Sequence, residues 1–238
     1  MKQLKLTFLL TMLMSMVGTK AFAYSCKVDL ICYDINNSNQ TATVTYSGSP
    51  YNNEYTGHYG GGNLSGLNIQ IPSTISYNDV EYTVIAIGDH AFYDCENTVL
   101  MASITIPSTV TSIGNQAFWK CTNLTSFTIP SSVTSIGHSA FSGCTGLTSI
   151  TIPSSVTKIG SSAFDDTPWY KNQTDGLIYA GKVAYKYKGT MPENTAIVIN
   201  DGTLSISDYA FLNCIGLTSI TIPSTVTSIG ERAFEDCI

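Results

Sequence analysis

Cysteine is the chemically reactive residue type that recurs most regularly in this chain. Five of the seven cysteines occupy one position of a repeated pattern: Cys95, Cys121, Cys144, Cys214 and Cys237. Cysteine tolerates complete burial, so the thiols could simply fill a core. The same series could instead form a ladder of disulfides, or thiolates could bind zinc.

Geometry favours buried free thiols over both reactive alternatives. Equivalent cysteines in stacked coils would lie about 5 Å apart with parallel side chains, which leaves their Cβ atoms too distant for a disulfide. Thr167 interrupts the series, and the total is odd. Cys26 and Cys32, outside the repeat, could pair only if the first strand bends. Zinc needs four ligands that converge on a point rather than a line, so we expect no metal site.

The histidines and the known catalytic motifs give no indication of an enzyme. His58, His90 and His138 share no repeat position, so each is expected at the surface rather than as a base. The sequence contains none of the short motifs typical of metalloproteases, α/β-hydrolases or phosphate-binding loops. We therefore expect no catalytic residues and no cofactor, because no nucleophile has a base and an orienting group.

Serine and threonine supply the regular polar pattern instead. In successive repeats they alternate with Ile or Phe, so in a strand they point away from the core. These candidate partner-binding residues are Ser103, Thr105, Ser126, Thr128, Ser149, Thr151, Ser219 and Thr221. They predict two hydroxyl rows on a concave sheet face, a surface that repeat proteins use for binding. The alternative is a solvated face in which Thr is favoured by β propensity; ice or mineral binding is opposed by the curvature of stacked coils.

A second candidate set lies between the regular repeats. Aromatic and cationic residues gather there, as at interface anchors: Trp169, Tyr170, Lys182, Lys186 and Lys188. They indicate an anionic partner such as a sialylated or sulfated glycan. The alternative is that the aromatic rings pack a hairpin on the core while the lysines keep its edge soluble.

A repeat of 23 residues must position all of these side chains. Residues 106–118, 129–141 and 152–164 are near copies of one another. A fixed period of this length indicates stacked coils, none of which buries its apolar face alone. The strands of successive coils should form a parallel sheet with a spacing of about 4.8 Å.

Each coil should consist of a short strand, a bend, a return segment and one helical turn. Phe127 and Ile129 alternate as in a strand. Ala140, Phe141 and Cys144 share one face of a helical turn. We also expect one continuous internal stack of phenylalanines: Phe92, Phe118, Phe141, Phe164, Phe211 and Phe234.

The repeat motif resembles the BspA-type, or Treponema pallidum-type, leucine-rich repeat over about residues 84–164 and 197–238. The residues that carry the resemblance are Phe141, Cys144, Leu147, Ile150, Ile152, Pro153, Val156, Ile159, Gly160, Ala163 and Phe164. The resemblance implies a leucine-rich-repeat solenoid of the α/β horseshoe type, with short parallel strands on the concave face and single helical turns outside. It also implies a bacterial surface adhesin associated with host matrix proteins or coaggregation.

The family often has an asparagine ladder between coils, and this chain has hydroxyls at the corresponding positions. They are Thr109, Ser132, Ser155 and Thr225, whereas Gly202 has no side chain to contribute. Because hydroxyls both donate and accept, we expect a hydroxyl ladder that is broken at Gly202.

The expected organisation has five segments. They are a signal peptide (1–23), an N-terminal β cap with a loop and an irregular first coil (24–83), leucine-rich repeats (84–164), a hairpin island of about 24 inserted residues (165–196), and leucine-rich repeats that end without a cap (197–238). Hairpins are expected at 28–46, around 77–82 and at 177–187.

The first residues predict export. Lys2 and Lys5 precede an apolar run over 6–17, and Ala21-Phe22-Ala23 fits a signal-peptidase site. A lipoprotein signal at Cys26 fits less well, because Tyr24 is unsuitable. No segment reaches the length of about 20 apolar residues that a membrane span requires.

Charge argues against a nucleic-acid partner. Removing the signal takes away three of the 11 cationic residues and leaves 17 acidic ones, a net charge of about −9. Binding to a phosphate backbone requires many Lys and Arg. We therefore expect a secreted or cell-surface, non-enzymatic protein that binds a host matrix protein, another bacterial surface or a glycan. The alternatives are a structural interaction module of a larger surface assembly and a glycan-binding accessory.

Overall fold

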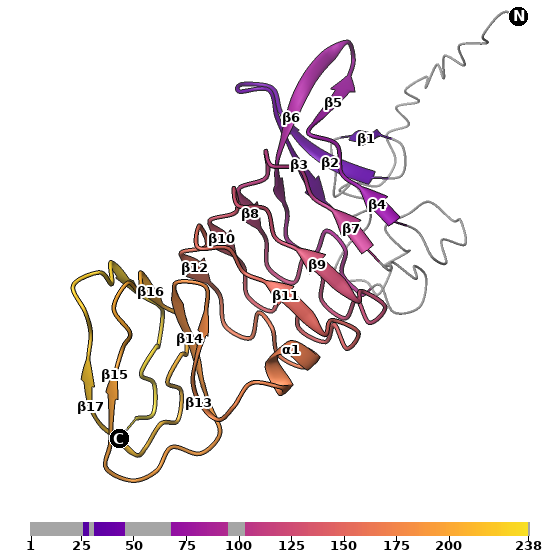
Figure 1. Cartoon of the computed structure of the whole chain (residues 1–238). Helices are drawn as coiled ribbons and strands as arrows, with labels where there is room; N and C mark the ends of the chain where they lie inside the picture. The colour runs from indigo at the N-terminus through magenta and orange to yellow at the C-terminus, as the bar shows by residue number, and fades with distance from the viewer. Residues whose placement is uncertain (1–25, 29–30, 46–67, 95–102, 238) are drawn as a thin grey trace, which may run out of the picture.

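The computed structural model describes residues 26–28, 31–45, 68–94 and 103–237. Over this range the chain forms a solenoid of stacked coils with parallel strands (Figure 1). The only helix in the described part is α1 (Pro168–Lys171). The expected signal peptide, Cys95 and the loop at 47–66 lie outside the described residues.

Each coil contributes two short strands on different sides of the core. The first set is β4 (Asn68–Gln70), β7 (Ser103–Thr105), β9 (Ser126–Thr128), β11 (Ser149–Thr151), β15 (Thr195–Val198) and β17 (Leu217–Thr221). The second set is β6 (Val80–Ile87), β8 (Ser112–Ile113), β10 (Ser135–Ile136), β12 (Lys158–Ile159), β14 (Val183–Lys188), β16 (Ser205–Ile206) and β18 (Ser228–Ile229). The central Ile or Phe of each regular unit faces inward, as at Phe127 and Ile136.

The segments that close the coils are chains of turns, so the expected helical turns are wrong. Gln116 and Lys120 have positive φ values of 52° and 55°, which a right-handed helix excludes. This backbone directs alternate N–H groups to the next coil. Phe118 N–H donates to the Ala140 carbonyl at 2.8 Å, a bond between coils that replaces the internal bonds of a helix.

Two predicted hairpins lie at the N-terminal end. β2 (Ile31–Asn36) pairs antiparallel with β1 (Cys26–Val28) and β3 (Thr41–Thr45), and β3 continues in parallel onto β6. β5 (Thr74–Tyr77) pairs antiparallel with the start of β6 through Asn78 and Asp79, which have φ values of 51° and 61°. The hairpins are therefore present, and the role of residues 24–83 as a cap stays a prediction.

The phenylalanine stack exists in two parts, so the prediction of one continuous stack is wrong. Successive rings from Phe92 to Phe164 lie 5.2, 5.2 and 5.7 Å apart with planes within 7° of parallel. Phe211 and Phe234 form a separate pair at 5.2 Å. Two hydrophobic clusters correspond to these two parts of the stack.

The hairpin island separates the two clusters. β13 (Gly176–Ala180) and β14 form an antiparallel hairpin whose alternate side chains face opposite cores. Ile178 and Tyr185 belong to the first cluster, whereas Ala184 belongs to the second. Tyr185 meets Phe164 edge-on at 5.5 Å and so ends the parallel ring stack.

The island also fills one coil position of the solenoid. β14 pairs in parallel with β16, and Leu204 N–H donates to the Lys182 carbonyl as Thr227 N–H does to Leu204. The insertion of about 24 residues is thus a degenerate coil rather than an excursion from the stack.

The repeated thiols serve the packing between coils. The Sγ atoms of Cys144 and Cys237 donate to the carbonyls of Phe118 and Phe211 in the preceding coils, both at 3.0 Å. Cys144 and Cys214 are buried and form no disulfide, which confirms the expectation for these two.

The hydroxyl ladder is present at two of the predicted positions. Ser132 and Ser155 donate to the Val110 and Val133 carbonyls at 2.6 and 2.8 Å. The hydroxyl of Thr109 is buried and has no hydrogen-bond partner among the described residues.

Candidate functional site

The predicted hydroxyl rows are exposed on three neighbouring strands. On β9 and β11 the register places Ser126 beside Ser149 and Thr128 beside Thr151, and all four side chains are exposed. β7 adds exposed Thr105 and half-buried Ser103, whose hydroxyl donates to the Asn68 side chain at 2.5 Å. The six hydroxyls on β7, β9 and β11 are called the hydroxyl face below.

The other two predicted members of the rows lie elsewhere. Ser219 and Thr221 are exposed on β17, but their neighbours across the sheet are Ala196 and Val198. α1 lies beside β11, where Trp169 N–H donates to the Leu147 carbonyl at 3.3 Å. The structure therefore brings six of the eight predicted hydroxyls together and separates the pair on β17 (Figure 1).

The island aromatics pack against the core. Trp169 meets Phe164 edge-on at 4.9 Å, and Tyr170 meets Tyr185 edge-on at 6.4 Å. Burial, followed by the charges of Asp165 and Asp175, raises the pKa of Tyr170 to about 12. Both predicted aromatics are half-buried, which agrees with the packing alternative.

Two of the three predicted island lysines hold the island in place. Lys186 Nζ lies 2.9 Å from the Asp165 carboxylate and 5.4 Å from the centre of the Tyr170 ring. Lys188 Nζ donates to the Lys171 carbonyl at 2.8 Å and also to the carbonyl of Gln173. Lys182 is exposed, so it is the predicted island cation most accessible to a partner.

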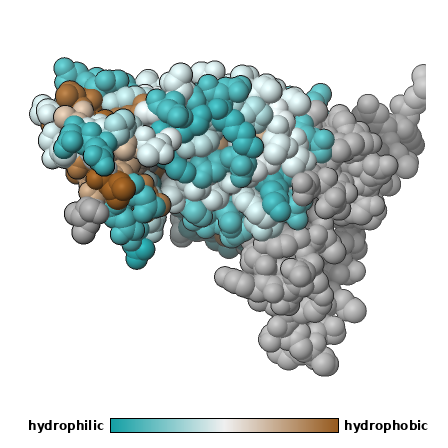
Figure 2. Space-filling view, turned by 90° about the horizontal axis from the view of Figure 1, so that it is seen from below, coloured by the Kyte–Doolittle hydropathy of each residue, from teal (hydrophilic) through white to brown (hydrophobic). Residues whose placement is uncertain are grey.

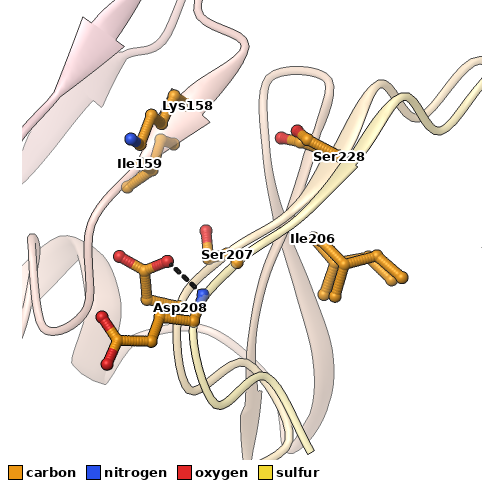
Figure 3. Close-up of a pocket in the computed structure, with 10 residues that line it drawn as sticks. Lys158, Ile159, Ile206, Ser207, Asp208 and Ser228 are labelled. Carbon is orange, nitrogen blue, oxygen red and sulfur yellow. Dashed lines mark hydrogen bonds between the residues drawn. The ribbon is translucent and has the colours of Figure 1, made fainter.

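Sequence reasoning missed the hollowed face of the solenoid, which lies over the second strand set. A hollow of about 320 Å³, called the break hollow, separates β12 from β16 and β18 (Figure 3). A second hollow of about 300 Å³, the central hollow, is lined by residues as distant in sequence as Asp89 and Asp208. Lys158 and Asp208 line both, so the two hollows adjoin.

A series of hydrogen bonds from backbone N–H groups to the side chains of Asp89, Asn115 and Asp208, called the polar column, runs along this face. The Asp89 carboxylate accepts from Asn115 N–H at 2.6 Å, and the Asn115 side chain accepts from His138 N–H at 2.8 Å. The Asp208 carboxylate accepts from Glu231 N–H at 2.8 Å in the same way. Side chains of one coil thereby satisfy backbone donors of the next.

The column explains the repeated glycine. A Cβ at Gly137 would lie 2.5 Å from the Asn115 nitrogen and 2.7 Å from its side-chain oxygen. A Cβ at Gly230 would lie 2.3 Å from the nitrogen of Asp208. The close approach of the preceding coil therefore requires glycine at these positions.

The histidine on this face lacks the geometry of a catalytic base. His138 Nδ1 lies 2.7 Å from Ser161 Oγ, and Nε2 lies 3.0 Å from Ser139 Oγ. Both ring nitrogens meet hydroxyls, so no carboxylate orients the ring as nucleophilic catalysis requires. Within the described ranges, no group of three or more His, Cys, Asp or Glu is arranged to hold a metal ion.

One sequence signal could have identified the break hollow, namely departure from the repeat. Lys158 stands where Ser112 and Ser135 stand in neighbouring coils. Ser207 stands at the position that holds Gly137 and Gly230 elsewhere. Both of these non-repeat residues line the break hollow.

A solenoid of this kind, with extended polar faces, defines a repeat-type binding scaffold. The chain belongs to the BspA-type leucine-rich-repeat family, because the family profile matches six copies over residues 68–176 and 181–238. Proteins of this family are generally non-enzymatic binding scaffolds, typically bind proteins, and are typically found at the cell surface.

Solved structures agree with this fold. A leucine-rich repeat protein from Bacteroides ovatus is 29% identical with a TM-score of 0.53, over 90% of this chain and 45% of that one. A leucine rich cell surface protein from Faecalibacterium prausnitzii is 26% identical with a TM-score of 0.51, over 92% and 53%. The chain thus spans about half the length of these relatives.

No curated protein sequence matches the chain significantly. Among the described residues, no helix has the length and apolar character needed to cross a membrane.

Proposed function

We propose that this protein is exported and acts as a non-enzymatic, adhesin-like binder of an extracellular protein. The hydroxyl face is the observation that carries the proposal, because three adjacent strands present exposed hydroxyls without charged side chains. The match to a family that typically binds proteins supports it. The predicted signal peptide supports export.

The chemistry of the hydroxyl face suits a protein partner. Interface cores are depleted in charged residues, whose desolvation is costly. Ser and Thr hydroxyls both donate and accept, so they can pair with peptide groups of either polarity. Their short side chains also lose little rotamer entropy when a partner covers them. A host matrix protein or the surface of another bacterium is the proposed partner class.

The test is binding to immobilised fibronectin and fibrinogen at physiological salt. The triple variant Thr105→Lys, Thr128→Lys, Thr151→Lys places three ammonium groups on the hydroxyl face and should abolish measurable binding. The matched control adds the same charges in the same coils at exposed serines away from that face: Ser108→Lys, Ser131→Lys, Ser154→Lys. Equal affinity of both variants for either protein would remove the hydroxyl face from the proposal.

An apolar patch favours the second candidate function, a structural module of a larger surface assembly. Val198 and Ile215 are 70% and 72% exposed. Brown apolar surface gathers at one end of the described part (Figure 2). Contiguous exposed apolar surface is typical of interaction sites. Sedimentation velocity of the wild type and of the Val198→Ser, Ile215→Ser double variant tests this candidate; a monomer in both cases would count against it.

A further inference from the structure

The break hollow combines two departures from the repeat with a buried polar atom that lacks a partner. Ser207 is 3% exposed, and its Oγ has no hydrogen-bond partner among the described residues. In Figure 3 this hydroxyl points toward the strand that carries Lys158 and Ile159, across the hollow. A buried hydroxyl without a partner is costly, so a ligand that pairs with it gains binding free energy.

The break in the sheet is what allows a side chain at this position. Elsewhere the preceding coil approaches so closely that only glycine fits, as at Gly230. The coil before Ser207 is the island strand β14, which carries no polar column of its own, and Ser207 N–H bonds to the Ala184 carbonyl. Space opens at the position, and the sequence fills it with a hydroxyl instead of an apolar group.

The charged groups around the hollow have both signs. Lys158 supplies an ammonium group from β12, and Asp208 and Glu231, which follow β16 and β18, supply carboxylates. In the part of the chain that the structure describes, Asp208 and Lys158 form no ion pair with each other, so both retain capacity to bind a ligand. Ser228 adds an exposed hydroxyl.

We propose that the break hollow binds a neutral glycan. Sugar hydroxyls can donate to the carboxylates of Asp208 and Glu231 and accept from Lys158 and Ser207. A phosphate, sulfate or sialate would meet two carboxylates against one ammonium group, which disfavours an anionic ligand.

The size of the face indicates a chain of sugars rather than one. The break hollow and the central hollow share Lys158 and Asp208. A third hollow of about 300 Å³ adjoins them at His138 and Asp208 and also reaches Tyr185. Together they form a trough across several coils. This site is independent of the hydroxyl face, because it lies on the other strand set.

The experiment measures binding of neutral hexasaccharides by isothermal titration calorimetry, with cellohexaose, maltohexaose, mannohexaose and xylohexaose as probes. 3′-Sialyllactose and a heparin hexasaccharide serve as anionic probes. The test variants are Ser207→Gly and Lys158→Ser, each of which restores the residue found in the other coils. The matched control is Ser131→Gly, an exposed serine outside the trough.

At least one neutral hexasaccharide should bind, and each test variant should weaken it about tenfold through loss of one hydrogen bond. Ser131→Gly should leave the affinity unchanged. The melting temperatures of the variants show whether each remains folded, and Asp208→Asn provides a further variant if one does not.

Three results would overturn the proposal. They are no binding of any neutral probe at up to about 1 mM, unchanged affinity in both Ser207→Gly and Lys158→Ser, and tighter binding of the anionic probes than of the neutral ones. Loss of binding to fibronectin and fibrinogen in the hydroxyl-face variant would not change these results, so the two proposals fail separately.

Discussion

Replacing Gly137 by alanine should destabilise the protein strongly, although alanine is usually the better residue for an ordered chain. The new Cβ would lie 2.5 Å from backbone atoms of the preceding coil, closer than any real contact. The two coils must move apart to make room for the Cβ, and such overpacking lowers the free energy of unfolding by about 1–3 kcal/mol. Weakening the bond from His138 N–H to Asn115 costs about 1 kcal/mol more.

The reduced freedom of the unfolded chain offsets part of this loss. A glycine-to-alanine change at a compatible backbone gains about 0.4–1 kcal/mol from that source. The net effect should therefore be a decrease of about 2–3 kcal/mol in the free energy of unfolding. Urea denaturation followed by circular dichroism measures it as a lower midpoint with an unchanged slope.

Ser207→Ala is the matched comparison, because Ser207 occupies the same repeat position at the sheet break. Its Cβ is already accommodated, and the change removes a buried hydroxyl without a described partner. The free energy of unfolding should stay within about 0.5 kcal/mol of wild type or rise. Equal destabilisation of the two variants, or a Gly137→Ala protein as stable as wild type, would refute the explanation of the glycine by close approach of coils.

Three further perturbations test the packing and the electrostatics. Phe141→Ala removes a fully buried ring from the stack and should lower the free energy of unfolding by about 3–5 kcal/mol in urea titrations; a loss below about 1 kcal/mol would contradict its central place. The buried Cys144 thiol should react with Ellman's reagent only after unfolding, so rapid labelling of the native protein at this residue, checked with Cys144→Ala, would disagree with the structure. The pKa of Tyr170 is raised from 10.0 to about 12, so this tyrosine ionises first in the unfolded state. The contribution of Tyr170 to the free energy of unfolding should therefore be complete below pH 10 and be lost as pH rises toward 12. A Tyr170→Phe variant should lose less stability over that window, as urea midpoints measured at both ends would show.

The regular coils could be predicted because their signals are local and repeated. The alternation at Phe127 and Ile129 indicates strands, and the two positions are buried. The prediction of helical turns was wrong because the spacing of Ala140, Phe141 and Cys144 fits one helical face and a chain of turns equally well. The positive φ values that decide between them occur at non-glycine residues such as Gln116, which carry no strong sequence signal.

The island could not be predicted from the repeat motif, because its sequence departs from that motif. Its added length is close to one 23-residue period, which could have indicated a degenerate coil. The hairpin at 177–187 was predictable from alternation, but its burial on both faces depends on coils on either side. The trough could not be predicted from the repeat motif, because several residues that line it differ from one repeat to the next.

The division of the core by β13 and β14 gives the molecule two cooperative units. Each unit has its own ring stack, and among the residues that the structure describes only the hairpin presents side chains to both. Heat or force should therefore melt one block while the other remains folded, with the hairpin acting as a joint between them. Calorimetry should record this as an endotherm broader than a single transition of the same enthalpy.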